Sequence, residues 1–200
     1  HIPIDDHGNF APGAADKFAA RDPETGLQYL ELVKVDRLVA LNGPMVENAT
    51  ARLGDTWTAG TPGAFATVFK HAPYNLPGLV SYTSPGVAVS DGTADACTAT
   101  HRRECLTMSA PNGGRIVSAR LWLPGYSASL NGEPVPVVRH AEFLVAVDLP
   151  PGAAGSLVIT YSPPGFPLTP VLMLLTLLGL AAATLFTGRH GRGVAHGPAW

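Results

Sequence analysis

The chain has 200 residues, with 22 glycines, 19 prolines and a formal net charge of −2. This length fits one domain of ordinary size plus an additional segment, and the glycine and proline content favours a β-rich module with many turns over a helical bundle. A nearly neutral chain has no broad electrostatic field to attract nucleic acid, so we do not expect nucleic acid to be a partner.

Residues 1–22 are predicted to be an irregular N-terminal segment. His1, Asp5, Asp6 and His7 could be drawn as a metal or acid–base cluster, but polar groups in an irregular segment are more often solvated. Adjacent side chains of an extended segment point to opposite sides, which is poor geometry for acid–base work shared by Asp5 and Asp6. We therefore predict no catalytic residue, no metal site and no cofactor here.

Residues 23–165 are predicted to form the main β-rich domain. The stretch 21–35 carries a helix-start signal, with Asp22 as the N-cap and Pro23 at the first helical position. Short apolar runs bounded by turn residues then predict three strands, which lie within 36–42, 63–72 and 78–84.

The pattern sharpens from Arg115 onward, where apolar residues recur with a period of two. Asn131-Gly132 predicts a two-residue hairpin turn, because both residues tolerate positive φ. The alternation places several side chains on the buried face of their strands: Tyr126, Ala128, Leu130, Phe143, Val145, Val147, Leu149, Leu157, Ile159 and Tyr161. Short connections between these strands indicate an antiparallel β-sandwich or a comparable two-layer module.

The two cysteines, Cys97 and Cys105, lie in the stretch "CTATHRREC". His101 alone supplies a third candidate ligand, so no zinc set is complete. In an oxidising compartment the pair would close a short loop as a disulfide, and two free thiols are the alternative. Three histidines, His71, His101 and His140, lie in expected loops and strand edges, and all three are predicted to be solvated.

An apolar run without charged residues extends from Leu168 to Phe186. At about 1.5 Å per residue, a helix of this length nearly matches a hydrocarbon core of about 30 Å. Residues 166–187 are therefore predicted to form a transmembrane helix in contact with the lipid bilayer, the alternative being a buried helix of a soluble protein. The predicted fold class is mainly β: an antiparallel β-sandwich-like extracytoplasmic domain followed by a single C-terminal transmembrane helix.

Flanking charges predict the orientation of this span. Arg189 and Arg192 follow it, whereas no Lys or Arg lies from Leu149 to Pro167. The positive-inside rule then places the tail 188–200 in the cytoplasm and residues 1–165 outside it, with the protein in the cell membrane.

The order of elements in the second half of the chain resembles the C-terminal end of the YfhO-like bacterial membrane proteins and related GT-C glycosyltransferases. The resemblance rests on the hairpin "LPGYSASLNGEPVPVV", the segment "FLVAVDLPPGAAGSLVITYSPPGF" and the apolar run that follows them. Tyr126 stands where the family usually has Trp. The positions that fit the family are Asn131-Gly132, Phe143, Pro151-Gly152, Tyr161 and Pro163-Pro164-Gly165.

The resemblance implies a polytopic enzyme of cell-envelope assembly that transfers sugar from a polyprenyl-phosphate donor. This chain would be its C-terminal outer domain and last membrane helix, in contact with upstream membrane helices of the same protein. The catalytic carboxylate of such enzymes lies in an early loop that matches nothing here, so no catalytic residue is assigned. The alternative is a non-enzymatic, membrane-tethered extracytoplasmic binding or assembly module.

Two aromatic residues are candidates for contact with envelope carbohydrate or a polyprenyl-linked sugar. Trp122 and Tyr126 flank the start of the hairpin and could stack on a sugar ring. They could equally fill the core of the module or anchor at a lipid interface.

Overall fold

The computed structural model describes residues 20–41, 43–92, 97–165 and 172–180. The chain divides into two compact units, His1–Tyr161 and Ser162–Trp200. The candidate cluster of His1, Asp5, Asp6 and His7 lies outside the described residues.

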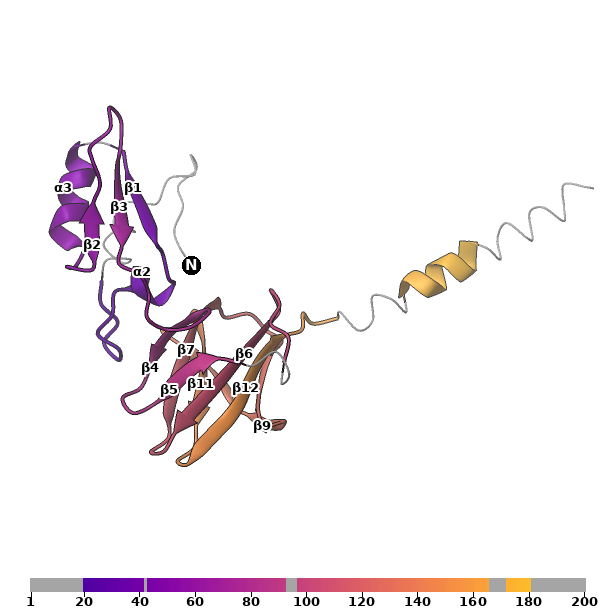
Figure 1. Ribbon diagram of the computed structural model, residues 1–200. Coiled ribbons are helices and arrows are strands. Elements are labelled where there is room, and N and C mark those ends of the chain that lie inside the picture. Colours follow the sequence, from indigo (N-terminus) through magenta and orange to yellow (C-terminus); the bar gives the residue numbers. More distant parts are fainter. Residues whose placement is uncertain (1–19, 42, 93–96, 166–171, 181–200) are drawn as a thin grey trace, which may run out of the picture. The chain divides into compact units, whose positions relative to one another are not determined.

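Two antiparallel sheets of the first unit pack face to face as a β-sandwich (Figure 1). One sheet has the strand order β10–β11–β7–β4 and the other β5–β6–β12–β8–β9. The strands are Val80–Thr83 (β4), Ala88–Asp91 (β5), Arg103–Ala110 (β6), Gly114–Leu121 (β7), Tyr126–Leu130 (β8), Glu133–Val135 (β9), Val137–His140 (β10), Leu144–Leu149 (β11) and Ala153–Tyr161 (β12). The predicted sandwich is thus confirmed.

Strand β11 shows how the alternating pattern builds the core. Val145, Val147 and Leu149 lie between the two sheets, as predicted. The prediction for Phe143 is wrong, because a β-bulge shifts the register between Leu144 and Val145. Leu144 and Phe143 pack together on the outer face of the four-stranded sheet instead.

The predicted hairpin turn is also confirmed. Asn131 and Gly132 join β8 to β9 with φ angles of 53° and 89°. The Asn131 side chain then reaches strand β12, where its Oδ1 accepts a hydrogen bond from the Ser156 N–H at 2.9 Å and its Nδ2 donates to the Ala154 carbonyl at 2.9 Å. The turn is therefore fastened to a strand outside its own hairpin.

A smaller layer precedes the sandwich in the sequence. It consists of helix α2 (Tyr29–Leu32), strand β1 (Arg37–Ala40), helix α3 (Gly43–Arg52), and strands β2 (Trp57–Ala59) and β3 (Thr67–His71). The strands form a sheet in the order β1–β3–β2, and apolar residues of α3 pack against the buried Trp57 and Phe69 of this sheet. The predicted strands at 36–42, 63–72 and 78–84 are confirmed as β1, β3 and β4, whereas α3, β2, β5 and β6 were not predicted.

The predicted helix start at Asp22 is wrong. The Asp22 carboxylate accepts hydrogen bonds from the Thr25 N–H and hydroxyl, both at 2.8 Å, and the Gly26 N–H donates to the Asp22 carbonyl. These bonds close a turn that doubles the chain back, so α2 begins only after Gln28. Asp-Pro is equally a turn signal, and here the turn prevails.

The predicted transmembrane helix over residues 166–187 is also wrong. The structure describes helical residues here at 172–180. Nowhere in the described ranges does a helix combine the length and apolar character needed to cross a membrane. Residues 166–171 and 181–187 lie outside the described residues.

The localisation derived from that span is corrected with it. A single crossing, with residues 1–165 outside and the tail 188–200 inside, depended entirely on the helix that the structure contradicts. The disulfide prediction does not depend on it and is confirmed: Cys97 and Cys105 are bonded, with their Cα atoms 5.8 Å apart. That bond points to an oxidising, extracytoplasmic setting.

Candidate functional site

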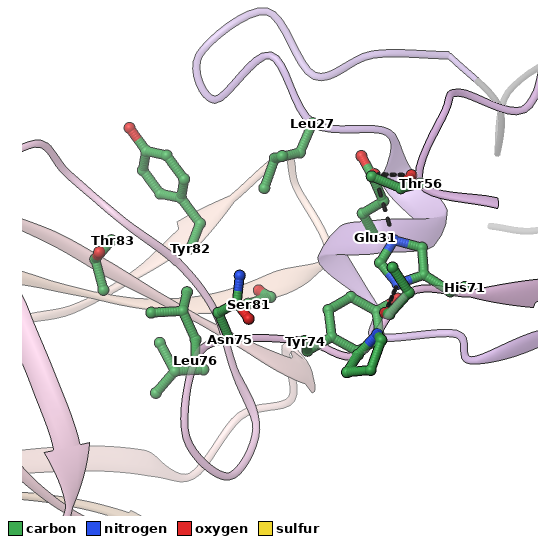
Figure 2. Close-up of a pocket in the computed structure, with 13 residues that line it drawn as sticks. Leu27, Glu31, Thr56, His71, Tyr74, Asn75, Leu76, Ser81, Tyr82 and Thr83 are labelled. Atoms are coloured by element: carbon green, nitrogen blue, oxygen red, sulfur yellow. Dashed lines mark hydrogen bonds and ion pairs between the residues drawn. The ribbon is translucent and has the colours of Figure 1, made fainter.

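A pocket of about 360 Å³ opens where α2, strand β4 and the loop 72–79 meet (Figure 2). Its volume falls within the range of about 300–1,000 Å³ that is typical of small-ligand sites. Figure 2 shows Glu31, Thr56 and His71 grouped on one side and Tyr82 and Thr83 on the other. The lining residues are Leu27, Glu31, Thr56, His71, Ala72, Pro73, Tyr74, Asn75, Leu76, Val80, Ser81, Tyr82 and Thr83.

A buried carboxylate forms the polar side of this pocket. Glu31 Oε2 accepts a hydrogen bond from the Gln28 N–H at 2.7 Å, and Oε1 accepts one from the Thr56 hydroxyl at 2.9 Å. His71 Nε2 lies 3.5 Å from Glu31 Oε1. Burial alone would raise the pKa of Glu31, but these hydrogen bonds and the nearby imidazole hold that pKa below its ordinary value. The pocket therefore contains a carboxylate that stays ionised.

His71 is held in place by two aromatic rings and a carbonyl. Its ring stacks on Tyr74 with a centroid distance of 4.2 Å, and Trp57 meets it edge-on at 5.0 Å. Its Nδ1 bonds to the carbonyl of Ala72. With both nitrogens engaged and the ring stacked, His71 is a rigid part of the pocket wall.

Tyr74 fastens the loop 72–79 to the end of α2. Its hydroxyl donates to the Val35 carbonyl at 2.7 Å. Burial, followed by the nearby carboxylates of Glu31 and Asp36, raises the pKa of Tyr74. The phenol thus remains protonated and keeps donating this hydrogen bond at all ordinary pH values.

Lys34 fastens the same loop at a second place. Its Nζ donates to the carbonyls of Leu76 at 2.9 Å and Gly78 at 2.7 Å. Burial lowers the pKa of Lys34, while the carboxylates of Glu104 and Asp91 oppose that shift. The ammonium points to these carbonyls and does not line the pocket. Among the described residues, the pocket lining contains no Lys or Arg.

The rim of the pocket carries polar groups with unused hydrogen-bonding capacity. Within the described part of the chain, the Asn75 amide, the Tyr82 hydroxyl and the Thr83 hydroxyl have no hydrogen-bond partner. Ser81 donates its hydroxyl to the Val117 carbonyl at 3.2 Å and keeps its lone pairs free to accept. The rim can therefore both donate to and accept from a bound molecule.

A second polar cluster surrounds the buried His140 and reaches the surface at Glu24 and Asp148. The side chain of His140 is fully buried, with Nε2 3.1 Å from Asp22 Oδ2 and Nδ1 3.3 Å from Glu24 Oε2. Arg115 bridges Glu24 and Asp148, with a 2.6 Å contact to each. The cluster attaches the turn before α2 to the four-stranded sheet.

The three histidines that were predicted to be solvated differ in their exposure to solvent. His101 is exposed, as predicted. The prediction is wrong for His71 and His140, which are buried beside carboxylates.

The two predicted sugar-contact residues lie away from the pocket. Trp122 is partly buried against the sandwich core, and the Arg139 guanidinium lies 5.3 Å from the centre of its ring. Tyr126 packs on the same core and meets the ring of Tyr161 at 4.8 Å. Neither residue lines the pocket.

The pocket residues gave no signal in the sequence. Nothing in the sequence separates Glu31 from an ordinary helical carboxylate, and the stretch "HAPYNLPG" is typical of a connection between two strands. The pocket depends on contacts between parts that are distant in sequence: Glu31 and Thr56 are 25 positions apart, and Val35 and Tyr74 are 39 apart. The one local hint is that His71, Tyr74 and Asn75 lie within five positions, and such residues are common in binding loops.

Comparisons with known proteins assign the chain to no family. No protein-family model, no curated protein and no solved structure matches it.

Proposed function

We propose that the first unit is a non-catalytic accessory domain of a polyprenyl-phosphate-sugar-dependent glycosyltransferase of cell-envelope assembly. The transfer reaction is carried out by residues outside this chain. The domain acts in an oxidising compartment outside the cytoplasm and helps to shape the site for the sugar acceptor.

One observation carries the proposal. The motifs that resemble the GT-C glycosyltransferases fall on consecutive strands of one sandwich, namely the hairpin β8–β9, the start of β10 and the strands β11 and β12. The Asn131-Gly132 turn within them is fastened to β12 through Asn131. The resembling segment is thus an interlocked structural unit. The Cys97–Cys105 disulfide further supports the compartment.

The test is a transfer assay in the native host. Removing the codons for residues 20–161 should strongly reduce transfer of radiolabelled sugar from a polyprenyl-phosphate donor into envelope glycan, while immunoblotting verifies that the remaining enzyme accumulates. Glu47→Gln, on the exposed side of α3, is the matched control and should leave transfer unchanged. Undiminished transfer after the deletion would reject the proposal.

A second candidate is a non-enzymatic assembly module, and the outer face of the three-stranded sheet favours it. The cross-strand partners Val39 and Val68 are 54% and 42% exposed there, and Phe65 in the loop before β3 is 86% exposed. Apolar side chains gathered on one face are typical of protein contacts. Under this candidate, the deletion would leave sugar transfer intact, and Val39→Lys with Val68→Lys would alter self-association in sedimentation velocity.

A further inference from the structure

We propose that the pocket between α2, β4 and the loop 72–79 binds an uncharged pyranose unit of an acceptor glycan and rejects the phosphorylated sugar donor. The biological place of this ligand rests on the proposed function. The ligand class itself follows from the charge, hydrogen-bonding groups and rigidity of the pocket.

The charged groups of the pocket disfavour anionic ligands. Glu31 is ionised at its polar side, and the Lys34 ammonium is directed at the carbonyls of Leu76 and Gly78. A sugar phosphate would bring a negative charge to a lining whose one described group able to carry positive charge, the His71 imidazole, already faces the Glu31 carboxylate at 3.5 Å. No described group of the lining is then left to offset the cost of desolvating the phosphate. A neutral ring meets no such penalty.

The chemistry of the lining suits a polyol with one apolar face. Asn75, Tyr82 and Thr83 offer both donors and acceptors, which a ring of hydroxyl groups requires. Leu27 and Leu76 offer apolar surface for the C–H face of the ring. A small number of polar groups on a mainly apolar lining is the usual composition of a small-molecule site.

The pocket is also fixed before any ligand arrives. Glu31 is held by Gln28 and Thr56, and the loop 72–79 is held by Lys34 and by the Tyr74 hydroxyl. A site that is already ordered loses little conformational entropy on binding. Weak individual sugar contacts can therefore add up to measurable affinity.

The test is a titration of the purified full chain followed by ¹⁵N–¹H NMR. The probes are the methyl α-pyranosides of glucose, galactose and mannose, each compared with the corresponding sugar 1-phosphate. At least one methyl pyranoside should give saturable shifts at Tyr74, Asn75 and Tyr82, and its 1-phosphate should bind about tenfold more weakly or not at all. Absence of saturable shifts with all three methyl pyranosides, or equal or tighter binding of the 1-phosphate, would overturn the inference.

Variants locate the binding. Asn75→Ala and Tyr82→Phe remove unpartnered rim groups and should each weaken the pyranoside up to about tenfold without unfolding the domain. Tyr126→Phe on the sandwich is the matched control and should bind like the parent. Equal weakening by the control would place the sugar elsewhere and reject the site.

Failure of this inference is distinct from failure of the proposed function. If the pyranosides do not bind but deletion of residues 20–161 abolishes transfer, the pocket assignment falls and the accessory role stands. If they bind and the deletion leaves transfer intact, the ligand class stands and the glycosyltransferase role falls.

Discussion

At the scale of single residues, the most consequential side chain of the sandwich is His140. Its ring is fully buried, and each of its nitrogens faces a carboxylate of the turn that precedes α2. Burial alone would raise the pKa of Asp22, but the Thr25 hydroxyl and N–H, together with His140, hold that pKa below its ordinary value of 3.8. Losing one member of such a pair leaves the other buried without compensation.

This geometry predicts the effect of Asp22→Asn. Because the folded-state pKa of Asp22 is lowered, its contribution to stability is complete above about pH 4 and is lost as the pH falls through the folded value. The variant should lower the free energy of unfolding by about 3 kcal/mol at pH 7, with a shrinking difference from the parent towards pH 2. Urea unfolding at several pH values measures this difference.

The matched control is Asp36→Asn. Asp36 lies 3.8 Å from Arg37 and its side chain is 80% exposed, so its loss should change the free energy of unfolding by only about 0–1 kcal/mol. A difference between Asp22→Asn and the parent that is as large at pH 2 as at pH 7 would contradict the role assigned to this carboxylate.

Buried carboxylate–histidine pairs of this kind could not be predicted from the sequence. Asp22 and His140 are separated by 118 positions, and Glu31 and His71 by 40. Nothing in the local pattern distinguishes them from solvated residues. The disulfide could be predicted, because its two cysteines are only eight positions apart and have no competitor in the chain.

At the scale of elements, the hairpin β8–β9 depends on a glycine in another strand. A Cβ atom built on Gly155 of β12 would lie 2.1 Å from Asn131 Oδ1, and the φ of Gly155 is 124°. Gly132, within the turn itself, also has a positive φ of 89° but has open space around it. A side chain at Gly132 would therefore cause backbone strain alone, whereas one at Gly155 would also clash with Asn131.

Replacing each glycine by alanine should give unequal losses. Gly132→Ala should lower the free energy of unfolding by about 1 kcal/mol, from backbone strain alone. Gly155→Ala should lower the free energy of unfolding by about 1–3 kcal/mol more than Gly132→Ala does, because the Asn131 amide must give up its two hydrogen bonds to β12. Thermal unfolding of both variants checks the order, and equal losses would refute the steric argument.

The elements that could be predicted are those whose signal is local. The alternation in β11 and β12 and the Asn131-Gly132 turn each identify their own structure within a few residues. Strand β7 lies against the sandwich core on one face and against α2 on the other, so Ile116, Val117 and Ser118 are all buried. Because both faces are buried, the alternation in the sequence does not tell which face of β7 lies in the sandwich core. The apolar run at 166–187 shows the opposite error, because composition alone predicted a membrane-spanning helix that is not found among the described residues.

At the scale of the whole first unit, the Cys97–Cys105 bond closes a loop at the start of β6. On the chain-entropy description, a loop of this length contributes about 2–3 kcal/mol to stability. Replacing both cysteines by serine should lower the free energy of unfolding by that amount in urea. Reducing the parent protein should have the same effect, and an unchanged midpoint after complete reduction would show that the bond adds nothing to stability.

The single turn of α2 has a consequence for how this unit comes apart. Leu30 lies in the apolar cluster of the three-stranded sheet, whereas Leu32 lies in the cluster on the outer face of the four-stranded sheet. Residues two positions apart on a helix point to opposite sides, so one turn is embedded in two separate interiors. If either apolar cluster unfolds, α2 loses its packing on that side and the other cluster loses a buried leucine. We therefore expect the two layers to unfold together on heating.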